Sequence, residues 1–302
     1  MASEMLAGGS QMSKEIYQQI TDQLIEKLED GTVPWHKPWT AGPGGWPRNL
    51  KTGRRYNGIN VWILSLSPKA TTPYWLTFNQ AKSLGGHVRK GEKSTVVVFW
   101  KFIDKEYEEA GETKHDRFPY LKTYRVFNAS QCDGLKREVA PGEVAPGDAE
   151  ELDFCPIEAC EAIADGYKGK PEVTHDGNGS AFYRAIDDSI HLPERETFDG
   201  EAEYYSTLFH EFAHSTGSKG RLNREGVRSG ASYDIAVYSD EELVAEFTAA
   251  MLCGEAGIER KTIENSAAYI KGWLKRLKDD TKLAVIAAAR AQKAADHILG
   301  TK

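Results

Sequence analysis

Cysteine is scarce in this sequence and lacks the spacing of a thiolate metal site. Only four cysteines occur in 302 residues, and no two of them form a Cys-x-x-Cys pair. A disulfide framework and a cysteine-ligated zinc site are therefore not expected. No apolar run approaches the roughly 20 residues of a membrane helix, and the first residues lack the basic-then-apolar order of a secretory signal. We expect a protein of the reducing cytoplasm that does not enter a membrane.

A large net charge is also missing, because two opposite excesses offset each other along the chain. The net charge is −7. Residues 1–128 carry 18 lysines and arginines against 13 acidic residues, whereas the remainder carries 20 against 32. Between residues 35 and 105 the numbers are 12 and 2. A polyanion that approaches this part of the chain meets a positive field, whatever the overall charge.

The order of the predicted elements indicates an α+β protein. Apolar residues at helical spacing predict a helix over residues 13–29. Runs of β-branched and aromatic residues predict strands over 94–103 and 120–128. Further along, helical periodicity predicts helices over 201–216 and 239–253, and the chain after them is helical almost throughout.

A change of composition divides the chain into two domains. Residues 129–152 contain the near-repeat EVAPGEVAPG and few large apolar residues, which is typical of a linker. We therefore predict a small mixed α/β domain at 1–128 and a mostly helical domain at 153–302. Residues 181–193, AFYRAIDDSIHLP, suggest one or two short strands that precede the helices of the second domain.

The most specific motif is H-E-x-x-H at residues 210–214, inside a predicted helix. His210 and His214 are four residues apart, so they project from one helical face and can bind the same ion. Glu211 lies beside them, where it can polarise a metal-bound water as the catalytic base. The motif predicts one divalent ion, with Zn²⁺ expected and Mn²⁺ as the alternative. A solvated helix that happens to carry two histidines is the competing interpretation.

A third ligand is expected from the helical segment YSDEELVAEFTAAML. This segment resembles metallopeptidases in which a glutamate completes the ligand set and an acid one turn later orients a histidine. The resemblance makes Glu242 the ligand and Glu246 the residue that supports a histidine. Glu241 is the alternative ligand if the helix is rotated, and an exposed acidic face is the competing interpretation.

Aromatic residues are concentrated in the basic part of the chain. Six of the seven tryptophans lie between residues 35 and 100, and the surroundings of Trp62 and Trp100 favour packing for those two. The other candidates lie on a Pro/Gly-rich loop among cations, a combination suited to stacking unpaired bases and neutralising phosphates. An aromatic core with a solvated basic face is the competing interpretation. The predicted DNA-binding residues are Trp35, Lys37, Trp39, Trp46, Arg48, Arg54, Arg55, Tyr56, Arg89, Lys90 and Lys93.

We find no helix-turn-helix or zinc-finger pattern, so single-stranded DNA is the favoured partner and duplex DNA the alternative. Taken in order, the blocks VPWHKPW, PRNLKTGRRYNGINVWIL, FHEFAHSTGSKGRLNR and YSDEELVAEFTAAMLC resemble the ArdC antirestriction family, whose N-terminal module recurs in conjugative primases. The resemblance implies a domain that binds single-stranded DNA, a zincin-like metallopeptidase domain, and protection of incoming plasmid DNA from host restriction during conjugation.

Three functions remain open at this point. In the first, the protein protects transferred DNA by coating it. In the second, it is an active metallopeptidase that uses DNA binding to reach a protein substrate such as a restriction enzyme. In the third, the metal only pins two helices together, although an intact Glu211 and a set of only three protein ligands argue against a purely structural site.

Overall fold

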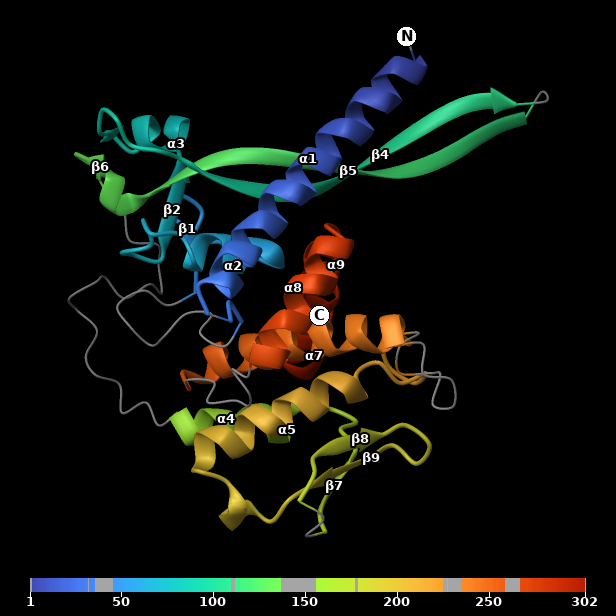
Figure 1. Cartoon of the computed structure of the whole chain (residues 1–302). Helices are drawn as coiled ribbons and strands as arrows, with labels where there is room; N and C mark the ends of the chain where they lie inside the picture. The colour runs from blue at the N-terminus through green and yellow to red at the C-terminus, as the bar shows by residue number, and fades with distance from the viewer. Residues whose placement is uncertain are drawn as a thin grey trace.

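The computed structural model describes residues 2–31, 33–35, 46–109, 112–136, 156–176, 179–224, 227, 235–258 and 267–301. The N-terminal part forms the upper half of the view in Figure 1, and the C-terminal part forms the lower half. Both contain helices and strands, which confirms the predicted α+β class. In the part of the chain that the structure describes, no helix is long and apolar enough to cross a membrane.

The N-terminal part is built on a four-stranded sheet with the order β1-β2-β5-β4. Its long members are the antiparallel strands β4 and β5, which run together far beyond the rest of the sheet (Figure 1). Their alternating β-branched and aromatic residues fit a sheet that is buried only in part. The strands are β1 (Arg48–Asn49), β2 (Tyr74–Thr77), β4 (Thr95–Glu109) and β5 (Glu112–Asn128).

Three helices accompany this sheet: α1 (Ala2–Glu29), α2 (Ile59–Ser65) and α3 (Phe78–Ser83). Asn60 of α2 pairs with the edge strand β4. Its side chain donates to the carbonyl of Val98 at 2.6 Å and accepts from the N–H of Val98 at 2.8 Å. The two bonds satisfy backbone groups that an edge strand otherwise leaves exposed, and they fix α2 against the sheet.

The predicted linker starts too early in the chain. Residues 129–131 form the short helix η1, and β6 (Cys132–Asp133) pairs with β3 (His87–Val88). This pairing requires a close approach at Gly86, where a Cβ atom would lie 2.7 Å from the carbonyl oxygen of Asp133. Residues 129–136 therefore belong to the N-terminal domain, and the rest of the predicted linker lies outside the described residues.

The C-terminal part combines helices with a three-stranded sheet of order β7-β9-β8. Strands β8 and β9 fall within residues 181–193, as predicted, and α5 contacts both of them. The helix predicted over 201–216 is α5. The elements are α4 (Pro156–Gly166), β7 (Glu172–His175), β8 (Phe182–Arg184), β9 (Ser189–Leu192), α5 (Glu201–Ser215), α7 (Ile235–Ala256), α8 (Ala267–Asp279) and α9 (Leu283–Ile298).

The larger of two hydrophobic core clusters in the described residues contains side chains from both parts. Trp62 of α2 stacks on Phe247 of α7, with ring centroids 4.2 Å apart. Trp35 packs edge-on against Phe247 at 5.3 Å and against Trp273 of α8 at 5.6 Å. Helix α1 packs against α8, and the hydroxyl of Thr21 donates to a carbonyl in the turn between α8 and α9. The two domains are thus fixed against each other by buried aromatic rings.

Candidate functional site

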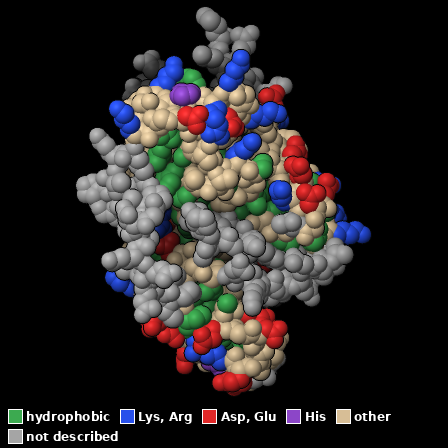
Figure 2. All heavy atoms as spheres, turned by 90° about the vertical axis from the view of Figure 1, so that its left-hand side faces the viewer, with side chains coloured by type: hydrophobic (Ala, Val, Ile, Leu, Met, Phe, Trp, Pro, Cys, Tyr) green, Lys and Arg blue, Asp and Glu red, His purple; other side chains and the backbone are tan. Residues whose placement is uncertain are grey.

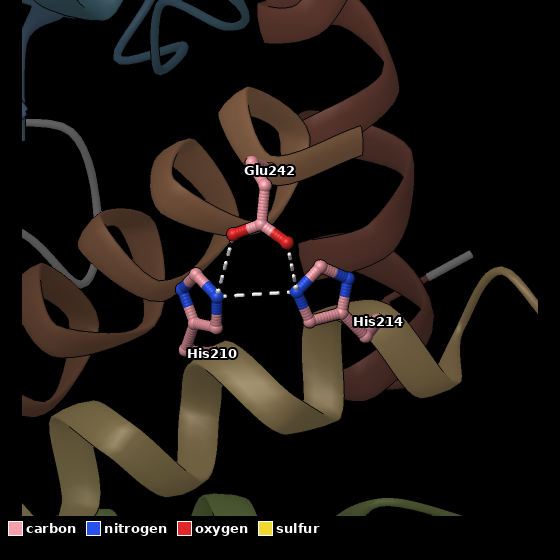
Figure 3. A group of neighbouring side chains, drawn as sticks. All are labelled: His210, His214 and Glu242. Atoms are coloured by element: carbon pink, nitrogen blue, oxygen red, sulfur yellow. Dashed lines mark hydrogen bonds and ion pairs between the residues drawn. The ribbon is translucent and has the colours of Figure 1, made fainter. Parts of the chain in front are cut away.

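Helices α5 and α7 bring together the three predicted metal ligands (Figure 3). His210 and His214 project from α5, and Glu242 points toward both rings from α7. The two Nε2 atoms lie 3.1 Å apart. One carboxylate oxygen of Glu242 lies 3.4 Å from Nε2 of His210, and the other lies 3.3 Å from Nε2 of His214.

These separations fit the donor set of a tetrahedral divalent ion. Metal–nitrogen and metal–oxygen bonds of about 2.0–2.1 Å at the tetrahedral angle place neighbouring donors about 3.3 Å apart. The two Nε2 atoms lie within 0.2 Å of that separation, and each of them lies within 0.1 Å of it from one of the two carboxylate oxygens of Glu242. Imidazole nitrogen and carboxylate oxygen are also ligands that Zn²⁺ and Mn²⁺ accept. The residues present therefore fit a divalent ion in both chemistry and spacing.

Two other acids of α7 face the outer nitrogens of the same histidines. Glu246 lies 3.8 Å from Nδ1 of His210, and Glu241 lies 3.7 Å from Nδ1 of His214. Each histidine thus has one ring nitrogen toward the centre and the other toward a carboxylate, an arrangement that fixes ring orientation. Between the two candidate ligands left open by the sequence, Glu242 occupies the position toward the centre and Glu241 the supporting position.

Glu241 is held by Arg224, a residue that the sequence did not single out. The guanidinium contacts the carboxylate at 2.5, 2.9 and 3.2 Å, and both side chains are almost fully buried. Arg224 also donates to Thr216 Oγ1 and to the carbonyl of Ala213. The loop after α5 brings it there by turning back on Gly217, where a Cβ atom would lie 2.4 Å from Val227.

His214 and the carboxylates of Glu241 and Glu242 shift one another's pKa toward the charged forms. Burial works to lower the pKa of His214, but the Glu241 and Glu242 carboxylates outweigh it and raise that pKa well above the usual value. Burial likewise works to raise the pKa of Glu242, yet the two histidines hold it far below its ordinary range. The site is therefore a buried cluster in which positive charge, as protons or as a cation, is strongly favoured.

Glu211 follows His210 directly in α5 and is only 5% exposed. Its charge contributes to the raised pKa of His214, which places it within electrostatic reach of the cluster. No other described group of histidine, cysteine, aspartate and glutamate side chains converges in the same way.

Two of the predicted DNA-binding residues that the structure describes are buried. Trp35 is fully buried in the shared core, so the prediction that it stacks on a base is wrong. Its partners, Phe247 and Trp273, come from distant parts of the chain, and the loop composition gave no sign of them. Tyr56 is also buried, at 5% exposure, and packs in a small second core, so its ring is not presented as predicted. Lys37 and Trp39 lie outside the described residues.

The other predicted residues are at least partly accessible. Trp46 and Arg48 are half-buried, and the indole N–H of Trp46 donates to the carbonyl of Tyr56 at 2.7 Å. Arg55 forms a two-bond ion pair with Glu255 of α7. Arg89 pairs with Glu92 and Asp133. The predicted cations with exposed side chains are Arg54, Arg55, Arg89, Lys90 and Lys93.

Sequence reasoning missed two exposed aromatic rings on the sheet. Phe99 of β4 is 43% exposed and Tyr124 of β5 is 40% exposed. Direct cross-strand partners share a face of a sheet, and so do residues two apart on one strand. Val97 pairs with Tyr124 and lies two residues from Phe99, so alternation could have placed both rings on one face. Which face stays uncovered depends on tertiary packing, and the alternation does not reveal that.

Two family models match the chain. Residues 14–127 match the N-terminal domain of anti-restriction factor ArdC. Residues 160–291 match a zincin-like metallopeptidase. The two matches correspond to the two parts of the fold.

Among curated proteins, a DNA primase TraC of Escherichia coli is 35% identical over 309 residues, which cover 96% of this chain and 27% of the primase. A second TraC primase of the same species is 35% identical and is covered over 20% of its length. The chain thus spans about a quarter or less of these primases. Protein y4eC of Sinorhizobium fredii is 31% identical, with 95% of this chain and 92% of y4eC covered.

Among solved structures, the chain is similar to the antirestriction protein ArdC from plasmid R388. The metal-free form is 39% identical with a TM-score of 0.71, and the match covers 93% of this chain and 96% of ArdC. The Mn(II)-bound form is 38% identical with the same TM-score, and the match covers 94% and 97%. Identity at this level over nearly the whole of both chains shows that this chain belongs to the ArdC family of antirestriction proteins.

Proposed function

We propose that this protein binds single-stranded DNA through its N-terminal domain, protects transferred plasmid DNA from restriction, and holds a peptidase-type metal centre in its C-terminal domain. The observation that carries the metal centre is the convergence of two Nε2 atoms and a carboxylate at 3.1 to 3.4 Å, with Glu211 buried beside them. His210, His214 and Glu242 are the ligands in this proposal.

When bound, a divalent ion supplies a Lewis acid that polarises a carbonyl and lowers the pKa of a water. The chain's own residues transfer the proton and orient the ligands. Glu211 accepts the proton of the attacking water and passes it to the leaving amine. Glu246 and Glu241 hold the two imidazoles so that their Nε2 atoms stay directed at the centre.

The metal assignment is supported by the donor set and by the Mn(II)-bound form of the R388 protein. We propose Zn²⁺ as the ion held in the cell, with Mn²⁺ as the alternative that the relative favours. Three protein ligands, rather than the usual four of a structural zinc site, support a catalytic centre.

DNA binding is supported by the match to the N-terminal domain of ArdC and by the likeness to DNA primases. Single-stranded DNA is proposed as the partner, and duplex DNA is the alternative. The proposed substrate, whose peptide bond the metal centre would cleave, is a protein bound at the DNA such as a restriction enzyme. Protection by coating the DNA alone is the competing mechanism.

The test is Glu211→Gln, which removes the base but leaves the three ligands in place. We expect the variant to bind the ion and single-stranded DNA as the wild type does, and to lose hydrolysis of a peptide library. Restriction protection is measured on the same samples. Hydrolysis that persists in the variant excludes Glu211 as the base, and protection that persists without hydrolysis assigns protection to DNA coating.

A further inference from the structure

Two exposed aromatic rings on the N-terminal sheet form a platform with a lysine beside them. Phe99 and Tyr124 lie on neighbouring strands with ring centroids 5.3 Å apart and nearly perpendicular planes. Lys122 is the direct cross-strand partner of Phe99, and its ammonium group lies 5.0 Å over the ring of Tyr124. We call these three residues the sheet-face patch.

The sheet-face patch borders a packed core on the same face of the sheet. Val97 pairs with Tyr124 and is fully buried, as is Val126 one alternation further along β5. These valines cluster with Tyr56, Leu64 and Trp75. The rings therefore lie next to a packed core, which lowers the entropic cost of presenting them to a ligand.

The patch continues into a row of aromatic residues. The ring of Tyr56 lies 6.3 Å from that of Phe99, and the carbonyl of Tyr56 accepts the indole N–H of Trp46. At this far end the guanidinium of Arg55 lies 5.4 Å over the Trp46 ring. A cation thus lies beside an accessible ring at each end of the row, and Arg55 also pairs with Glu255.

Charge favours an anionic ligand for this row. Among the residues of β4 and β5 whose side chains the structure describes, those on the patch face are Thr95, Val97, Phe99, Lys122, Tyr124, Val126 and Asn128, and none of these is acidic. In Figure 2, lysine and arginine side chains are spread over the upper part of the molecule among some acidic side chains, and further acidic side chains lie at its lower end. A partner with flat apolar groups and regularly spaced negative charge matches rings that alternate with cations.

We infer that the sheet-face patch, continued by Trp46 and Arg55, is the surface on which single-stranded DNA lies, with bases stacked on Phe99 and Tyr124 and a phosphate neutralised by Lys122. This inference rests on the proposed function that the N-terminal domain binds single-stranded DNA. It moves the contact from the loop tryptophans to the sheet. Paired bases in a duplex do not offer the faces that such rings need, so the surface selects single strands.

The test uses leucine variants, because Phe99→Leu and Tyr124→Leu keep apolar volume on exposed positions but remove the flat ring. Affinity for a fluorescein-labelled oligo-dT strand is measured by anisotropy in the full-length protein. One lost stack is expected to weaken binding about fivefold to a hundredfold. Lys122→Ala is expected to reduce the slope of log affinity against log salt by about 0.7. Phe182→Leu, a ring of similar exposure in β8, is the matched control and is expected to bind as the wild type does.

Two results separate failure of this inference from failure of the proposed function. If the wild type binds oligo-dT and both leucine variants bind it as tightly as the wild type, DNA binds elsewhere, and the assignment of DNA binding to the sheet-face patch is wrong. If the wild type itself does not bind oligo-dT, the proposed function fails. Equal loss of duplex and single-strand affinity in the variants also overturns the inference, because paired bases cannot stack on these rings.

Discussion

Trp35 provides the sharpest test of how the two domains are joined. The composition of its loop suggested a ring that stacks on DNA, whereas the structure places it in the core against Phe247 and Trp273. Truncation of a fully buried tryptophan to alanine costs about 3–5 kcal/mol of folding free energy. Each of the two edge-on ring contacts accounts for about 0.5–1.5 kcal/mol of interaction beyond the buried area.

A loss of this size is a large part of the stability of a natural domain, which is about 5–15 kcal/mol. We therefore expect Trp35→Ala to lower the midpoint of thermal unfolding by on the order of 10 °C. Trp35→Phe keeps one ring in the site and is expected to lose less. Phe78→Ala, at a ring that is 46% exposed, is the control and should leave the midpoint nearly unchanged.

The assay pairs thermal or urea unfolding with oligo-dT affinity at a temperature where every variant is folded. The core role predicts reduced stability and nearly unchanged affinity for Trp35→Ala. A variant that unfolds like the wild type but binds DNA about fivefold or more weakly would match base stacking instead, and it would refute the position of Trp35 in the core.

Three further predictions concern the C-terminal domain. Arg224→Met should lower affinity for the ion about 10- to 100-fold, measured by chelator competition, because Glu241 is no longer held against His214; unchanged affinity would remove Arg224 from the support of the site. Arg221 holds the pKa of Asp188 below its usual value, so the stability from this contact is present above about pH 4 and is lost as pH falls through the lowered pKa. Asp188→Asn should therefore flatten the acid side of the stability curve, and a curve that stays as steep would contradict this. Removal of the ion with EDTA should lower the unfolding midpoint, by a free energy near 2.7 kcal/mol for a sample held at about 100 times the dissociation constant; a midpoint that does not respond to EDTA would rule out ion binding at this level.

Local patterns in the sequence were enough to predict the α+β class and the elements of the site. Helical spacing places His210 and His214 on one face, and the same spacing on α7 places Glu242 and Glu246 one turn apart. His210 and His214 lie close together as that spacing predicts, because their positions depend only on one short stretch of helix. The approach of Glu242 and Glu246 to these histidines is a contact between helices, which was expected from the resemblance to metallopeptidases.

Long-range packing is what the sequence did not reveal. Trp35 and Phe247 are more than 200 residues apart, and no local pattern connects them. Arg224 lies in a loop whose return path beneath α5 depends on a close approach at Gly217. Alternation marks Phe99 and Tyr124 as strand residues, but only the packing of neighbouring elements decides which face of a sheet is covered.

The central claim is that His210, His214 and Glu242 hold one divalent ion and that Glu211 stands beside it without binding it. The most direct test is the metal content of purified protein dialysed against excess Zn²⁺ or Mn²⁺, measured by mass spectrometry. We predict one ion per chain for the wild type, for Glu211→Gln and for Glu241→Gln, and a loss of the ion in Glu242→Gln. Loss of the ion in Glu241→Gln with full retention in Glu242→Gln would contradict the claim and make Glu241 the ligand.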